Sequence, residues 1–204
     1  MGFPASDGVY VSYPADELYA IVCLEAGRHG TMVVGEDLGT VPDGVRETMH
    51  ARGVRRSHVL QFSFVRNEHA AIEPAPAASL ASVNTHDTPT FAAFWRDSDP
   101  PLRAAVATYL RGRGRVPDAG EPDAGSVLLG CLEELALGDA ETLLVNLEDL
   151  WGEDEPQNVP GTSGEGSRNW CRRARYGLEE MFELPEVRDE LRHIHDLRRQ
   201  GAPA

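Results

Sequence analysis

Four short runs of apolar residues constrain the fold of this chain more than any other feature. They span residues 32–34, 58–62, 80–83 and 143–145, and each is followed by a turn or a helix signal. None of them alternates polar and apolar side chains, as a half-exposed strand does, so we expect strands that are buried on both faces. Such strands are typical of parallel sheets covered by helices. The pattern predicts an α/β fold.

Segments with helical periodicity lie between these runs. Residues 15–29 place Leu18, Ile21, Val22 and Ala26 on one side of a predicted helix that ends before Gly30. Further helices are expected from Pro42 to Gly53, over residues 127–137, and from Pro185 onward. Residues 67–79 and 112–125 are rich in Pro, Ala, Gly and Asp, which predicts surface loops.

The alternating series yields about four βα units, which we treat as one domain over residues 1–204. A closed (β/α)8 barrel contains eight such units in typically about 250 residues. We therefore expect an incomplete part of a TIM barrel. In that fold the catalytic groups sit at the C-terminal ends of the strands, which directs attention to the polar residues that follow each apolar run.

Glu36 and Asp37 follow the first run directly. A carboxyl group at a strand end, half covered by its neighbours, can stay protonated near neutral pH and donate a proton to a leaving oxygen. Glu36 is therefore a candidate general acid. The alternative is that Glu36 or Asp37 caps the helix that follows.

The third run leads into Asn84-Thr85-His86-Asp87-Thr88-Pro89-Thr90. Asp87 could stabilise a positively charged transition state, and His86 could bind a sugar hydroxyl. Alternatively, Asp87 or Thr88 caps a helix and His86 is structural. His86 and Asp87 have no further ligands at metal-binding spacing, so we expect no metal.

Charge and cysteine content restrict the partners. The formal net charge is −14 at pH 7, which disfavours nucleic acid and anionic lipid and favours a neutral partner such as a sugar. Cys23, Cys131 and Cys171 form no disulfide or zinc pattern, and no run approaches 18 apolar residues. We expect a cytoplasmic protein with reduced thiols and no membrane contact.

Four stretches then occur in a fixed order: GEDLGTVP, NTHDTPT, VNLEDLWGEDEPQNVPGT and RNWCRR. Together they resemble the 4-α-glucanotransferases, also called amylomaltases or disproportionating enzymes, a family related to the α-amylases. The resemblance covers most of this chain but only the C-terminal portion of a typical family member. It implies a (β/α)8 barrel and a retaining double displacement on α-1,4-glucans, without cofactor or metal.

By this resemblance, Glu36 matches the general acid/base and Asp87 the transition-state stabiliser, which are the two carboxylates already singled out. The family carries its nucleophilic Asp on an earlier strand in an Arg-x-Asp-His-like motif. No such motif precedes Tyr10 here, so the nucleophile is expected to be absent from this chain.

The loop after the last run is expected to border the acceptor side of the cleft, again by resemblance. It offers Asn158, Gly161, Thr162 and Trp151 as sugar-binding groups, alongside His86. Amide and hydroxyl groups beside an aromatic ring suit a sugar, which has polar edges and apolar faces. The alternative is that Trp151 and Trp170 are core residues.

Three functions follow from these observations. The first is a 4-α-glucanotransferase that moves α-1,4-glucan segments between malto-oligosaccharides, with glucose as an acceptor. The second is a fragment that is inactive alone or binds glucan and needs an N-terminal half as its partner. The third is an α-amylase-class hydrolase that uses the same Glu36 and Asp87.

Overall fold

The computed structural model describes residues 7–9, 11–162, 164 and 166–201. Its sheet has four strands in the order β1-β2-β3-β4, and every neighbouring pair is parallel. The strands are β1 Val34–Gly35, β2 Arg55–Val59, β3 Ser79–Ser82 and β4 Thr142–Leu144. The predicted α/β class with about four βα units is confirmed.

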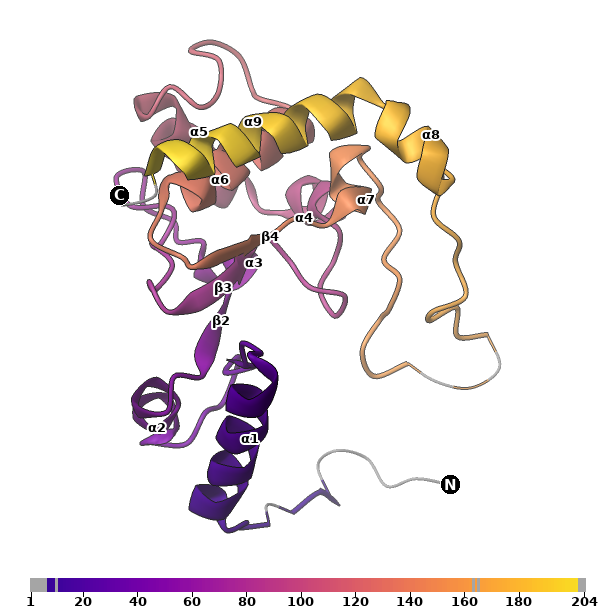
Figure 1. Cartoon of the computed structure of the whole chain (residues 1–204). Helices are drawn as coiled ribbons and strands as arrows, with labels where there is room; N and C mark the ends of the chain where they lie inside the picture. Colours follow the sequence, from indigo (N-terminus) through magenta and orange to yellow (C-terminus); the bar gives the residue numbers. More distant parts are fainter. Residues whose placement is uncertain (1–6, 10, 163, 165, 202–204) are drawn as a thin grey trace.

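Helices connect and cover the strands (Figure 1). They are α1 Ala15–His29, α2 Val45–Ala51, α3 Leu60–Ser63, α4 Phe91–Asp97, α5 Pro100–Gly112, α6 Ala124–Leu137, α7 Leu147–Leu150, α8 Leu178–Glu183 and α9 Pro185–Gly201. In Figure 1, α1 and α2 lie beyond β2, on the side away from β4, while α9 packs over α6 on the opposite side of the molecule. None of the helices in these ranges has the length and hydropathy needed to cross a membrane.

Local signals explain most of the boundaries. α1 ends as predicted, because Gly30 adopts a left-handed φ of 60° there. The helix expected from Pro42 instead begins at Val45, after Gly44 with φ 82°. The second strand was predicted too far along the chain, since it ends at Val59 and residues 60–63 form α3.

The main core lies between β3 and the helices α4, α5, α6 and α9. Its fully buried side chains include Leu60, Phe91, Leu110 and Leu132. The prediction of a surface loop over residues 67–79 was wrong in part, because Ala71 and other apolar side chains of this stretch are buried in that core. Residues 113–123 connect α5 to α6 without a helix or strand.

The β1 end of the molecule is open by contrast. Within the described residues, β1 pairs only with β2 and β4 only with β3, so each leaves one edge of the sheet unpaired. α1 buries none of its residues, and its apolar side chains Leu18, Ile21, Val22 and Leu24 are between 44% and 62% exposed. This apolar side of α1 and the two sheet edges are the surfaces that further strands and helices of a barrel would cover.

Candidate active site

Glu36 and Asp87 line one open pocket of about 680 Å³. Glu36 follows β1 and Asp87 comes soon after β3. Because the strands are parallel, both residues lie at the C-terminal ends of the strands. Leu38, Gly39, Phe62, Thr85, His86 and Thr88 complete the lining. The structure therefore brings the two predicted carboxylates together.

The side chain of Glu36 is exposed, whereas a half-covered carboxyl group was expected. Its Oε1 accepts a hydrogen bond of 2.6 Å from the backbone N–H of Leu38, which fixes the orientation of the carboxyl group within its own turn. Glu36 does not cap α2, because that helix begins nine residues later at Val45. Glu36 lies next to the open β1 end, where the described residues place no further strand beside β1.

Asp37, the neighbour of Glu36, is structural. Its side chain is 1% exposed and accepts hydrogen bonds from Arg46 at 2.9 Å and Arg56 at 2.7 Å. The backbone N–H of Ser57 donates a third bond of 3.1 Å. Burial by itself would raise the pKa of Asp37, but these donors outweigh it and hold that pKa below its ordinary value. Asp37 thus connects the end of β1 to β2 and α2. The alternative that Glu36 or Asp37 caps the following helix is wrong.

Asp87 is held by two side chains. The Nδ2 group of Asn158 donates to its Oδ1 at 2.6 Å, and Nε2 of His86 lies 3.3 Å from its Oδ2. More than half of each of the His86 and Asp87 side chains is exposed to solvent. The capping alternative fails here as well, because α4 begins at Phe91 with Thr90 as its preceding residue.

The other expected sugar-binding residues of the loop, Gly161, Thr162 and Trp151, do not line the pocket of Glu36 and Asp87. Gly161 adopts φ 79°, and the hydroxyl of Thr162 donates to the carbonyl of Val159 at 2.7 Å, so both shape a turn. Trp151 was expected to offer a sugar-binding surface, but it is a core residue. It is 9% exposed and packs edge-on against Tyr176, with 5.5 Å between ring centroids.

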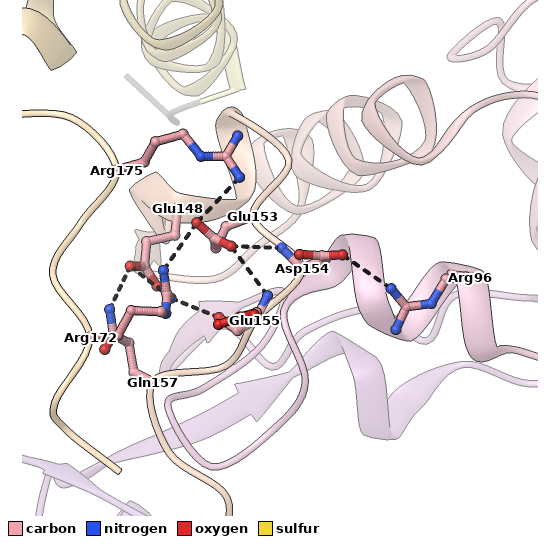
Figure 2. A network of polar contacts seen from close by, with 8 residues as sticks. All are labelled: Arg96, Glu148, Glu153, Asp154, Glu155, Gln157, Arg172 and Arg175. Carbon is pink, nitrogen blue, oxygen red and sulfur yellow. Dashed lines mark hydrogen bonds and ion pairs between the residues drawn. The ribbon is translucent and has the colours of Figure 1, made fainter. Parts of the chain in front are cut away.

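Figure 2 shows an ion-pair network that joins the beginning and the end of the segment between α7 and α8. Arg172 lies 3.2 Å from Glu148 and 3.0 Å from Glu153, and it donates to the carbonyl of Glu155 at 2.7 Å. Arg175 adds a contact of 3.5 Å to Glu153. Burial raises the pKa of Glu153, but backbone donors and the two arginines outweigh it and lower that pKa.

A second buried network links the loop after β3 to α7. Asn84 donates to Asp149 Oδ2 at 2.7 Å, and the backbone N–H of Phe91 donates to Oδ1 at 2.7 Å. Asn146 in turn donates to the side-chain oxygen of Asn84. Burial raises the pKa of Asp149 from its ordinary 3.8 to about 6, a rise that the two donors reduce and nearby Glu148 increases. This network supports the segment that carries His86 and Asp87.

Replacing Asp149 with Asn is expected to change how stability depends on pH. A carboxyl group whose pKa is higher in the folded state contributes stability that is greatest below its unfolded pKa and is lost as pH rises through the folded value. For Asp149 this stability is lost mainly between pH 3.8 and about pH 6. The full shift of its pKa corresponds to about 3 kcal/mol of folding stability. The free energy of unfolding of Asp149→Asn, minus that of the unchanged chain, should therefore rise by about 2 kcal/mol between pH 4 and pH 7, because the unfolded-state carboxyl is already partly ionised at pH 4.

Urea unfolding at several pH values measures this difference, and the titration of all other groups cancels in it. The new amide faces the side-chain amide of Asn84, which adds an offset that does not depend on pH. A difference that stays constant from pH 4 to pH 7 would show that Asp149 does not titrate in this window.

Sequence reasoning missed two residues that support this site. Arg172 and Asp149 were not singled out, although each lies inside a stretch that carried the resemblance. Trp170 was assigned to the core as an alternative, but it is 63% exposed and lies beside His86. Within the described ranges, no three His, Cys, Asp or Glu side chains are placed to hold a metal ion together.

A parallel sheet with helical connections, carrying carboxylates in a pocket at the C-terminal ends of its strands, defines part of a (β/α)8 barrel enzyme. Residues 3–179 match the family model of glycoside hydrolase family 77, described as 4-alpha-glucanotransferase. The chain belongs to this family.

Relatives agree with this assignment. The 4-alpha-glucanotransferase of Mycobacterium tuberculosis is 35% identical over 83% of this chain and 27% of its own length. That of Haemophilus influenzae is 31% identical over 89% of this chain and 30% of its own. The chain therefore spans less than a third of the length of these relatives.

Solved structures show the same fold. Amylomaltase from Streptococcus agalactiae, solved in complex with acarbose, superposes with a TM-score of 0.74 at 21% identity. That match covers 97% of this chain and 37% of the amylomaltase. Amylomaltase from Corynebacterium glutamicum gives a TM-score of 0.72 at 21% identity, over 93% and 32% of the two chains. The predicted resemblance to part of a family barrel is confirmed.

Proposed function

We propose that this chain supplies the acid/base, the transition-state stabiliser and a substrate-binding loop of a 4-α-glucanotransferase. The observation that carries the proposal is the shared pocket of Glu36 and Asp87. Family membership supports the same activity. The substrates are α-1,4-glucans and malto-oligosaccharides, with glucose as an acceptor, in the cytoplasm. No nucleic acid, membrane, cofactor or metal takes part.

The reaction proceeds in two steps. A carboxylate nucleophile from another part of the barrel attacks the anomeric carbon, while Glu36 donates a proton to the departing glycosidic oxygen. The hydroxyl of an acceptor glucan then attacks the same carbon, displaces the nucleophile and gives its proton to Glu36. Asp87 stabilises the positive charge that develops on the sugar ring in both steps, in an orientation held by Asn158.

The nucleophile must come from a neighbouring strand. In retaining enzymes the nucleophile and the acid carboxyl groups lie about 5–5.5 Å apart, so that one sugar ring fits between them. Within the described residues, β1 has a free edge next to Glu36, where a further strand could deliver this group. The partner of this chain is therefore the part of a family barrel that carries the earlier strands.

The test is to fuse this chain to the part of the Haemophilus influenzae 4-alpha-glucanotransferase that precedes the region matched here. The fusion is incubated with maltotriose, and its products are separated by chromatography. We expect longer glucans together with glucose, and neither product from this chain alone. Intact maltotriose after incubation with a folded fusion would contradict the proposal.

Two other outcomes favour the alternative functions. Products that are only shorter than maltotriose would indicate a hydrolase. A ladder of longer glucans from this chain alone would show that one of its own carboxylates acts as the nucleophile.

A further inference from the structure

Trp170 differs from the other two tryptophans of this chain. Trp95 is 5% and Trp151 is 9% exposed, whereas Trp170 is 63% exposed. Its φ of 59° makes it the one residue other than glycine with a left-handed backbone in the part of the chain that the structure describes. A bulky side chain in this conformation costs on the order of 1–2 kcal/mol and persists only where its surroundings enforce it.

The surrounding loop enforces this conformation. The backbone N–H of Trp170 donates to the carbonyl of Gln157 at 2.8 Å. On one side, the amide of Asn169 donates to the carbonyl and hydroxyl oxygens of Thr162 at 3.2 and 3.1 Å. On the other side, Arg172 lies in the ion-pair network of Figure 2. The backbone that carries the exposed indole ring is therefore held by contacts on both sides of Trp170.

The ring of Trp170 lies beside His86, a residue that lines the candidate active site. Its centroid lies 5.4 Å from that of His86, at an interplanar angle of 49°. His86 lines the pocket that contains Glu36 and contacts Asp87, which is also bound by Asn158. Trp170 thus has imidazole, carboxylate and amide groups close by, unlike the purely aliphatic side of α1.

We propose that Trp170 is a sugar-stacking residue, which binds the apolar face of a glucose ring next to the ring that Glu36 and Asp87 process. The indole offers a flat apolar surface, and the nearby polar groups can bind the hydroxyls at the edge of the same ring. The contacts on both sides of Trp170 hold its backbone, which lowers the entropy cost of ordering this segment when a sugar binds. This inference rests on the proposed function, since it names glucan as the ligand.

The experiment compares two substitutions that differ in the aromatic ring. Asn tolerates the left-handed backbone but has no aromatic face, while Phe retains such a face. Calorimetric titration of this chain with maltohexaose should show roughly tenfold weaker binding for Trp170→Asn than for the unchanged chain. Trp170→Phe should retain most of the affinity.

Fluorescence gives a second readout, because Trp170 is the exposed indole of the three. Saturation of the unchanged chain with maltohexaose should shift its emission to shorter wavelength, and this shift should be absent in Trp170→Phe although sugar still binds. Thermal unfolding of each variant shows whether it is folded. Equal affinity in the folded Asn variant, or no binding of maltohexaose to the unchanged chain, would overturn the inference.

These outcomes separate the inference from the proposed function. If the fusion transfers glucan and Trp170→Asn binds maltohexaose as well as the unchanged chain does, the stacking role is wrong and the transferase stands. If binding depends on Trp170 but the fusion forms no new glucans, this chain binds glucan and the catalytic proposal fails.

Discussion

Glu36→Gln in the fused barrel is expected to lower the rate of transfer from maltotriose by about 10²–10⁴-fold, the usual contribution of a general acid/base. The amide keeps the size of the carboxyl group but can neither donate the proton to the departing oxygen nor accept one from the acceptor. Its oxygen can still accept the hydrogen bond from the N–H of Leu38, so the local turn should persist. Initial rates of glucose release measure the effect.

A donor that needs no acid catalysis provides the control. Fluoride leaves α-maltosyl fluoride without protonation, so the first step should survive in Glu36→Gln, while the second step lacks its base. We expect a burst of about one fluoride per enzyme molecule, followed by slow turnover. Glu47→Gln, on α2 away from the pocket, should transfer glucan at the unchanged rate. Loss of the fluoride burst in Glu36→Gln would assign Glu36 a role other than acid/base.

Arg172→Met is expected to destabilise the chain by about 3 kcal/mol, the low end for breaking a buried ion pair, because Glu153 then keeps only Arg175 at 3.5 Å and its backbone donors. The side chains of Arg172 and Glu153 are only 15% and 7% exposed. Met fills a similar volume but cannot neutralise Glu153 or bind the carbonyl of Glu155. The free energy of unfolding, measured with urea near neutral pH, gives the size of the loss.

Arg96 offers a matched control within the same network (Figure 2). Its contact with Asp154 joins two side chains that are each 57% exposed. An exposed ion pair contributes about 0–1 kcal/mol, so Arg96→Met should leave the free energy of unfolding nearly unchanged. Equal effects of the two substitutions would show that burial of Glu153 does not determine the energetics of this network.

The sequence predicted much of the fold, because the apolar runs and helix ends are local signals. α1 and α9 begin at the expected residues, and all four strands lie at or beside the predicted runs. A helix after Pro89 was expected without bounds and corresponds to α4, whereas α5 was not predicted. The start of α5 had a readable signal, since Asp99 accepts a hydrogen bond from the N–H of Leu102 and Pro100 occupies the first helical position.

The site was predictable only where it depends on position along a strand. Glu36 and Asp87 share a pocket because parallel strands place their C-terminal ends at one edge of the sheet. The positions of Trp151 and Trp170 depend on contacts between distant segments, such as the ion pairs of Arg172 with Glu148 and Glu153. No local pattern distinguishes a buried tryptophan from an exposed one in such a loop.

The strands that lead to the two proposed catalytic carboxylates differ in how deeply they are buried. β3, which leads to Asp87, lies against the main core, so local unfolding of β3 would disrupt that core. β1, which leads to Glu36, follows α1 in the chain. Because α1 buries none of its residues, local unfolding of α1 requires little free energy. Asp87, the proposed transition-state stabiliser, is thus positioned by this chain itself. For Glu36, the proposed acid/base, we expect a fixed position only when further elements of a barrel cover α1.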